Sequence, residues 1–254
     1  MRCVRPAWRI TLCLPLALVA AGAGQAAPIV PLGLAVRADV ATSNDTQRLA
    51  HWVVSSNDAQ GRPFIIIDKV AARVFAFMPD GSLRGEAPAL LGLARGDISP
   101  PGIGNRKLVD IGPADRITPA GRFEAEMGRD LTNDILWVDY DAAISLHRVV
   151  TNKPAERRLA RLATASALDN RISYGCINVP AVFYETIVAP LFRPANGVVY
   201  VLPERRAFAD VFAAAAASGS PPSSWHIDAK PVSAPPGQSL PARADITAPK
   251  SESL

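Results

Sequence analysis

The stretch "FIIIDKVAARVFAFMPDGSLRGEAPALLG" (residues 64–92) contains apolar runs that are separated by turn residues. β-Branched and aromatic side chains dominate "FIIIDK" and "ARVFAFM", and the "PDG" that follows predicts a hairpin into "SLRGEAPALLG". "DILWVDYDAAISLHRVV" (134–150) indicates two further strands and "GVVYVLPE" (197–204) a last one. "TPAGRF" (118–123) is typical of a turn that leads into a strand. We therefore expect a mainly β domain over residues 62–205.

Helical patterns flank this domain. In the N-terminal segment 27–61, Asn44 followed by Gln47 three residues later predicts a capped short helix that carries His51. Residues 206–218, with "AFADVFAAAAAS", predict a terminal helix. The 36 residues from Gly219 onward contain seven prolines and few apolar side chains, so we expect 219–254 to be a disordered Pro/Ser/Ala-rich tail.

A further helical pattern lies inside the β-rich region, over residues 154–168. It predicts Leu159 and Leu162 on one face and Arg157, Arg158 and Arg161 on the opposite face. Two interpretations of the arginine face stay open. Either it overhangs a binding cleft and attracts acidic peptides, or it is a solvated surface. Exposed charges on such a surface contribute little free energy to their interactions.

The first 26 residues have the composition of a signal peptide. "MRCVRPAWRI" holds three arginines and no acid, an apolar run of 15 residues follows, and "GQAA" offers small residues for cleavage after Ala26. The alternative is an uncleaved membrane anchor, but the run is shorter than the ~20 residues that span a bilayer. The sequence predicts export to the periplasm, without a stable membrane span after cleavage.

Charge argues against nucleic-acid binding. The formal net charge is +4, and because three of the positive charges lie in the signal peptide, the remaining chain is near +1. No basic stripe with interleaved aromatic side chains is present in the sequence. We expect no nucleic-acid partner.

Cysteine usage directs attention to one residue. Cys3 and Cys13 leave with the signal peptide, so Cys176 is the one thiol of the exported chain. A lone cysteine cannot form an internal disulfide, and the three histidines of the chain supply too few further ligands for a zinc cluster. In an exported protein it indicates intermolecular pairing or a reactive thiol. A buried apolar filler remains the alternative.

Nucleophilic chemistry needs a base near the thiol. Of the three histidines, His226 lies in the tail and His51 on the N-terminal helix, which leaves His147, on a predicted strand with Ser145 on the same face. This choice among three histidines leaves open the alternative that His147 is a structural residue of the core. The bend before Cys176 contains Gly175 and can aim successive backbone amides at one point, as an oxyanion requires.

Together these residues resemble the catalytic domain of the L,D-transpeptidase (YkuD) family. His147, followed by Ser173-x-Gly175-Cys176-x-Asn178, is similar to the family signature H…[ST]-x-G-C-x-[RN]. "TPAGRF" is similar to its TPxGxF turn, and the strand pair from residue 64 and "NGVVYVLPE" to its opening and closing strands. The resemblance covers about residues 62–205. It implies a β-sandwich-like fold with a packed helix, here with a helical insertion at 154–168.

The resemblance also implies a set of roles. Cys176 would be the nucleophile and His147 its base, with the backbone carbonyl of Arg148 holding the histidine tautomer. Backbone amides at Tyr174, Gly175 and Cys176 would form the oxyanion hole. Ser173 and Asn178 would brace this loop and contact substrate. The implied reaction is transfer of a peptidoglycan stem peptide through a thioester to an amine, a step in cell-wall biogenesis that uses no metal or cofactor.

The chain departs from the family in two places. The family commonly has about half the spacing found here between His147 and Cys176, and a glycine commonly stands where Arg148 follows the histidine. Substrate preference is therefore open: water as acceptor would make an L,D-carboxypeptidase, and a lipoprotein lysine an anchoring enzyme. A catalytically silent wall-binding module of the same fold is the alternative outside enzymes. Sortases are disfavoured because their TLxTC-type strand is absent, and NlpC/P60 hydrolases because they place the cysteine before the histidine.

Overall fold

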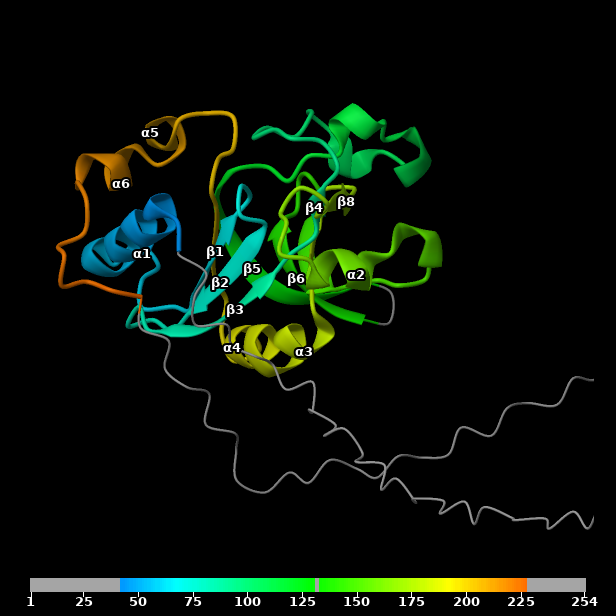
Figure 1. Ribbon diagram of the computed structural model, residues 1–254. Coiled ribbons are helices and arrows are strands. Elements are labelled where there is room, and N and C mark those ends of the chain that lie inside the picture. Colours follow the sequence, from blue (N-terminus) through cyan, green and yellow to red (C-terminus); the bar gives the residue numbers. More distant parts are fainter. Residues whose placement is uncertain (1–41, 131–132, 228–254) are drawn as a thin grey trace, which may run out of the picture. The chain divides into compact units, whose positions relative to one another are not determined.

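A computed structural model describes residues 42–130 and 133–227 of the chain (Figure 1). The expected signal peptide 1–26 and the tail from residue 228 lie outside the described residues. Eight strands form one sheet in the order β3-β2-β1-β10-β5-β6-β7-β9, and β4 pairs with β8 in a small second sheet. The strands are β1 (Phe64–Asp68), β2 (Arg73–Phe77), β3 (Leu83–Pro88), β4 (Leu91–Gly92), β5 (Gly121–Asp130), β6 (Asn133–Asp139), β7 (Ile144–Arg148), β8 (Arg171–Ser173), β9 (Ile177–Val179) and β10 (Gly197–Val201). The mainly β fold and the hairpin of β2 and β3 are confirmed.

The sheet is covered on both faces at β1 and β2, which explains why these strands are apolar without alternation. Ile65 and Val74 point into one core, which also contains residues of β6, β7 and β9. Phe64 and Phe75 point into the second. Because both halves of the long sheet contribute to the first core, the domain has the sandwich-like arrangement expected from the sequence.

The second core is closed by helices from both ends of the described chain. Helix α1 (Asn44–Ser56) buries Leu49 and Val53 there, and α5 (Phe208–Val211) and α6 (Ala213–Ala217) pack on the same face (Figure 1). The single terminal helix expected over 206–218 is thus two short helices, because the backbone leaves helical geometry at Phe212.

The expected cap at Asn44 is wrong by one residue. Ser43 is the N-cap, and its hydroxyl oxygen accepts a hydrogen bond of 3.2 Å from the amide of Thr46. Gln47 does not complete a capping box; its side-chain amide donates to the carbonyl of Thr42 instead. A serine hydroxyl caps as well as an asparagine carbonyl, and pattern alone does not choose between adjacent candidates.

The packed chain also extends past Gly219. Trp225 and Ile227 pack against the second core, and the ring of Trp225 meets that of His51 edge-on at a centroid distance of 5.3 Å. The first nine residues of the expected tail therefore include core contacts. His51 has a structural contact there, as expected for a histidine on this helix.

The opposite face of the sheet is covered by the helical segment 181–192. It runs as α3 (Ala181–Phe183), a π-helical turn η5 (Tyr184–Val188) and α4 (Ala189–Phe192). Pro190 cannot donate a backbone hydrogen bond to Thr186, and the wider π turn lies where this bond would be missing. Phe183 and Phe192 from this segment are almost fully buried in the first core.

The insertion is less helical than expected. A 3₁₀ turn, η4 (Pro154–Glu156), and the six-residue α2 (Arg158–Ala163) replace one helix over 154–168. Arg157 stands between them with a left-handed backbone (φ 49°), which interrupts the helix. Leu162 is buried, but Leu159 is 61% exposed, so the predicted apolar face is only partly formed.

A buried charge cluster ties the end of β1 to the loops around it. The Lys69 ammonium is fully buried and lies 2.7 Å from Oδ1 of Asp97, 2.5 Å from the carbonyl of Gly96 and 2.9 Å from that of Thr118. Burial alone would raise the pKa of the Asp97 carboxyl. The hydrogen bonds from Lys69 and from three backbone amides at 204–206 lower it by more, so the net pKa is about 2. The carboxylate is therefore charged across the neutral range.

None of the described helices is both long and apolar enough to span a bilayer. Three 3₁₀ turns complete the described elements: η1 (Ile103–Asn105), η2 (Leu108–Asp110) and η3 (Pro113–Asp115).

Removal of the Asp97 carboxylate should destabilise the fold strongly. Asp97→Asn leaves the Lys69 ammonium buried without its main counter-charge, which costs about 3–5 kcal/mol for a buried pair. We expect a loss of this size in the free energy of unfolding, measured by denaturant titration. The matched control is Asp115→Asn, which breaks an exposed pair with Arg106 and should cost less than about 1 kcal/mol. Equal effects of the two substitutions would contradict the structural role of the cluster.

Candidate active site

Two neighbouring strands bring the predicted dyad together. β7 and β9 pair in parallel, with His147 opposite Asn178 and Leu146 opposite Ile177. Cys176 directly precedes β9, and Ser145 lies two residues before His147 on β7. Side chains alternate between the faces of a strand, so the four polar residues share one face of the pair. They are Ser145, His147, Cys176 and Asn178. Residues 29 positions apart in the sequence therefore become neighbours.

The thiol of Cys176 lies among polar groups of β7 and of the turn before it. The side chain of His147 and the backbone amide of Ser145 are among the groups that lower its pKa. The Ser145 hydroxyl lies 3.6 Å from Sγ, and the carbonyl oxygen of Ala143 lies 3.8 Å from it. Cys176 is a free cysteine, and the residue as a whole is partly exposed.

His147 is oriented by the backbone beyond it. Its Nδ1 lies 2.7 Å from the carbonyl oxygen of Arg148, the contact that the sequence resemblance implied. With the Nδ1 proton donated to this carbonyl, Nε2 is the ring nitrogen left for the thiol. No carboxylate is needed to fix the tautomer.

The electrostatics favour a thiolate–imidazolium pair. Burial raises the pKa of the Cys176 thiol, but the hydrogen bond and charge of His147, together with the amide and hydroxyl of Ser145, lower it more, so the net pKa is below the usual value. Burial lowers the pKa of His147, and the hydrogen bond and charge of Cys176 raise it more, so the net pKa is above the usual value. Opposite shifts in two neighbouring groups are typical of catalytic pairs.

The loop before the thiol is fixed by its own hydrogen bonds. The Ser173 hydroxyl donates to the carbonyl of Cys176 at 2.7 Å and accepts from the amide of Gly175 at 3.1 Å. The Gly175 amide, one of the three expected to form the oxyanion hole, thus donates to the Ser173 hydroxyl in this structure. Among the hydrogen bonds of the described residues, the amides of Tyr174 and Cys176 have no acceptor.

Gly175 is required at its position. Its φ is +132°, and an added Cβ would lie 2.7 Å from the carbonyl oxygen of Ile117 and 2.6 Å from Cδ1 of Ile144. Its own carbonyl accepts a hydrogen bond of 2.7 Å from the hydroxyl of Thr118. Thr118 belongs to the "TPAGRF" motif, so this turn holds the loop that carries the thiol.

Several of these residues were not predicted as part of the site. Ser145 and Thr118 were noted only as strand-face and turn residues, although their polar side chains on buried strand and turn positions were a signal. Arg158 was assigned to a solvated or overhanging face, but it is only 13% exposed and its guanidinium donates to Oδ1 of Asn178 at 2.7 Å. Arg161 donates to the carbonyls of Glu156 and Asp169 and so braces the insertion itself.

The helix after the thiol does not act on it directly. β9 separates Cys176 from the first helical residue, Ala181. The low pKa of the thiol therefore comes from His147 and Ser145 and not from a helix N-terminus.

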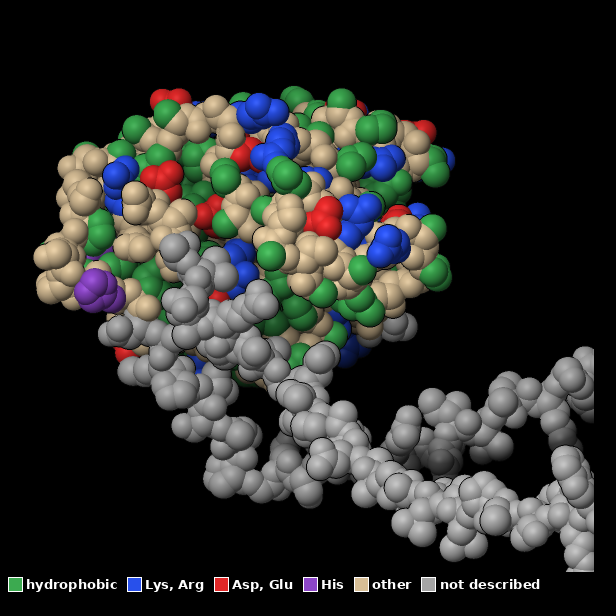
Figure 2. All heavy atoms as spheres, in the orientation of Figure 1, with side chains coloured by type: hydrophobic (Ala, Val, Ile, Leu, Met, Phe, Trp, Pro, Cys, Tyr) green, Lys and Arg blue, Asp and Glu red, His purple; other side chains and the backbone are tan. Residues whose placement is uncertain are grey.

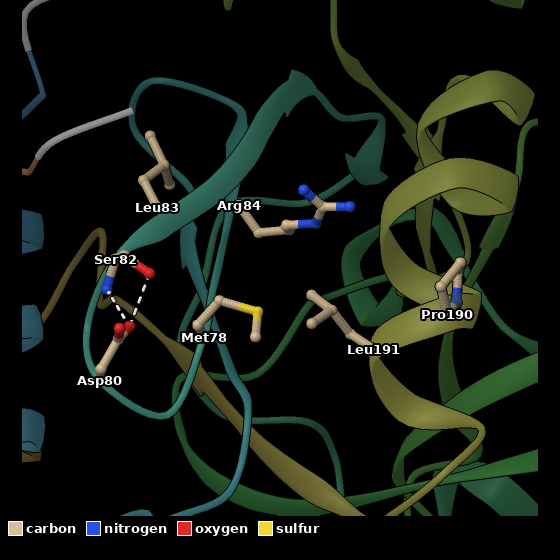
Figure 3. Close-up of a pocket in the computed structure, with 7 residues that line it drawn as sticks. All are labelled: Met78, Asp80, Ser82, Leu83, Arg84, Pro190 and Leu191. Carbon is tan, nitrogen blue, oxygen red and sulfur yellow. Dashed lines mark hydrogen bonds between the residues drawn. The ribbon is translucent and has the colours of Figure 1, made fainter. Parts of the chain in front are cut away.

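A hollow on the surface is lined by none of the residues of the dyad. It lies between the β2–β3 turn and the end of helix α4, lined by Met78, Asp80, Ser82, Leu83, Arg84, Pro190 and Leu191 (Figure 3). The described residues contain no group of three or more His, Cys, Asp or Glu side chains that could hold a metal ion.

A methyl group at Gly175 should disrupt the site. Gly175→Ala forces a side chain into a disfavoured backbone conformation and against Ile117, so we expect a loss of about 1–3 kcal/mol in the free energy of unfolding. Displacement of the loop should also slow alkylation of Cys176 by iodoacetamide. Gly112→Ala is the control, since no heavy atom lies within 4 Å of its added Cβ. An unchanged alkylation rate in Gly175→Ala would contradict the assigned role.

The dyad makes a prediction about pH. Alkylation requires the thiolate, so its rate should rise with pH through a midpoint below the ~8.5 of a free thiol. His147→Ala removes the stabilising positive charge, and the midpoint should then move upward. His51→Ala should leave it unchanged, because His51 contacts Trp225 instead. The measurement is the rate of iodoacetamide alkylation against pH. A midpoint that shifts in His51→Ala but not in His147→Ala would show that His147 is not the partner of the thiol.

Comparison with known proteins gives structural likenesses only. No family model matches the sequence, and neither does any curated protein. An L,D-transpeptidase from Xylanimonas cellulosilytica is 14% identical with a TM-score of 0.34, covering 56% of this chain and 60% of its own. The catalytic domain of an Enterococcus faecium L,D-transpeptidase is 16% identical with a TM-score of 0.34, covering 56% of this chain and 98% of its own.

The helical cell shape determining protein Pgp2 from Campylobacter jejuni is 16% identical with a TM-score of 0.35, covering 64% of this chain and 57% of its own. The chain thus spans about 60% of the length of the first of these proteins and less of Pgp2. At such identities and TM-scores the likeness does not carry over an activity. Several solved structures that the chain resembles are L,D-transpeptidase catalytic domains.

Proposed function

We propose that the chain is an exported cysteine transpeptidase that acts on peptidoglycan stem peptides. One observation carries this proposal: the side chains of Cys176 and His147 lie on one face of the β7–β9 pair and shift each other's pKa, while Nδ1 of His147 is held by the carbonyl of Arg148. This is the arrangement of a nucleophile, a base and an orienting group. The sequence motifs around both residues supply the substrate class.

The first half-reaction is acylation. The Cys176 thiolate attacks the carbonyl carbon of the third residue of a tetrapeptide stem, and a tetrahedral oxyanion forms. This intermediate collapses to a thioester, and the terminal D-alanine leaves after His147 gives its Nε2 proton to the departing amine. The unengaged amides of Tyr174 and Cys176 are the groups available to stabilise the oxyanion.

The second half-reaction regenerates the enzyme. The side-chain amine of a neighbouring stem attacks the thioester carbonyl, and His147 takes the proton that this amine loses. The new amide is a 3→3 cross-link, and the Cys176 thiolate leaves. Both steps use the same dyad, and neither requires a metal or a cofactor.

The partner and location follow from this chemistry. Peptidoglycan stems lie outside the cytoplasmic membrane, so the signal peptide expected at 1–26 would deliver the enzyme to its substrate in the periplasm. Ser173 braces the thiol loop through the Cys176 carbonyl, and the backbone of Asn178 exchanges two hydrogen bonds with Leu90, which lies between β3 and β4.

Product analysis tests the proposal. Incubation of the exported chain with a disaccharide-tetrapeptide should give a cross-linked dimer and free D-alanine, detected by mass spectrometry. Release of D-alanine without dimer would indicate a carboxypeptidase, and a covalent adduct resolved only by a lipoprotein lysine an anchoring enzyme. No turnover and no thioester adduct would indicate a silent binding module and contradict the proposal.

Single substitutions distinguish the roles of Cys176 and His147. Cys176→Ala should abolish both the thioester adduct and turnover, since the nucleophile is gone. His147→Ala should reduce turnover by at least about 10²-fold, the usual contribution of a positioned proton-transfer group. The matched control is His51→Ala, with turnover unchanged. Continued D-alanine release by Cys176→Ala would end the nucleophile assignment.

A further inference from the structure

Arg158 lies at the candidate active site although it comes from the insertion. Its Nη1 donates to Oδ1 of Asn178 at 2.7 Å, and its Nε donates to the Glu156 carboxylate at 2.6 Å. Asn178 stands opposite His147 in the β7–β9 register. The guanidinium thus lies at the end of a row that begins at Ser145 and Cys176 and continues through His147 and Asn178.

The charge of Arg158 also acts on the dyad. The Arg158 charge acts on His147 and lowers its pKa, against the larger effect of Cys176. A positive charge at Arg158 disfavours the protonated form of His147. Stabilisation of that imidazolium therefore does not explain why an arginine stands here. It would instead favour a negative charge brought to the site from outside.

The guanidinium keeps donors for such a charge. Two of its nitrogens are used by Asn178 and Glu156, and among the contacts of the described residues Nη2 has no partner. Glu156 is shared with Lys153 at 3.9 Å, so the group as a whole remains positive. Lys and Arg side chains gather over α2 on the surface (Figure 2). Arginine binds carboxylates well because its planar fork can donate two parallel hydrogen bonds.

We propose that Arg158 forms an anion subsite beside Cys176 that binds a carboxylate of the acyl donor. The proposal rests on the proposed function, in which the donor peptide ends in a free carboxylate one residue beyond the bond that is broken. Asn178 and Glu156 hold the guanidinium in place, and the donor carboxylate would reach Nη2 through the 13% of the side chain that stays exposed.

The competing explanation is that Arg158 only braces Asn178. The two explanations differ in their effect on charged and neutral reagents. Bracing affects access to the thiol equally for all reagents, whereas an anion subsite favours a reagent that carries a carboxylate. Iodoacetate and iodoacetamide have the same alkylating group, and the first carries a carboxylate where the second carries a neutral amide. The change of their rate ratio at Cys176 between the wild type and a variant therefore reports on the subsite.

The experiment measures this ratio in the full chain and three variants. In Arg158→Gln the iodoacetate-to-iodoacetamide ratio should fall by about threefold to tenfold, and the fall should shrink as salt is added. Arg158→Lys should retain part of the ratio, since the charge remains. The control is Arg157→Gln, which removes an equal charge at an exposed neighbour and should leave the ratio unchanged.

A second measurement identifies the ligand. Donor tetrapeptides that end in D-alanine or in D-alaninamide are compared by kcat/KM, and the preference for the free acid should be lost in Arg158→Gln and kept in Arg157→Gln. An alkylation ratio unchanged in Arg158→Gln overturns the subsite. A reduced ratio with the acid preference intact overturns the donor carboxylate as its ligand. A Cys176 that neither reagent modifies in the unsubstituted chain overturns the proposed function itself.

Discussion

The buried ammonium group of Lys69 is the constraint on which the surrounding structure depends. A cation that is buried away from water must be surrounded by oxygen atoms, or its burial destabilises the fold by several kcal/mol. Lys69 obtains them from the loop at 96–97 and from Thr118, while Asp97 in turn accepts the amides of residues 204–206. Arg171 adds a two-point contact to the buried Glu204 and a hydrogen bond to the carbonyl of Lys69. Five segments of the chain, at Lys69, 96–97, Thr118, Arg171 and 204–206, must therefore be in place together.

This constraint extends to the thiol. Thr118, whose carbonyl binds Lys69, uses its hydroxyl to hold the carbonyl of Gly175 and accepts the amide of Gly92 at 2.9 Å. The neighbouring carbonyl of Ile117 occupies the space where a side chain at 175 would lie. The loop that carries Cys176 is thus fixed from beneath by the same turn that completes the charge cluster. Such support keeps a nucleophile within the narrow geometric range that its chemistry requires.

Local patterns in the sequence predicted the parts of this structure that local forces determine. Apolar runs gave the strands, "PDG" gave the hairpin turn, and exclusion among three histidines brought attention to His147. Lys69 could not be recognised in this way, because a lysine at the end of a strand is normally exposed and its partners are 27 to 135 residues away. The position of Arg158 was missed for the same reason: helical periodicity assigned it to a face, but its contact with Asn178 depends on how two strands pair.

That pairing also explains why a long insertion is compatible with the dyad. Parallel strands cannot be joined by a tight turn and need a crossover of a dozen residues or more. The segment between β7 and β9 is such a crossover, so added residues lengthen a connection that must exist and do not separate His147 from Cys176. The register of the two strands fixes the dyad, while the crossover is free to vary. In this chain it returns over the end of β9 and places a guanidinium on Asn178. Sheet register thus determines the candidate pair, and the crossover determines which charges the pair meets.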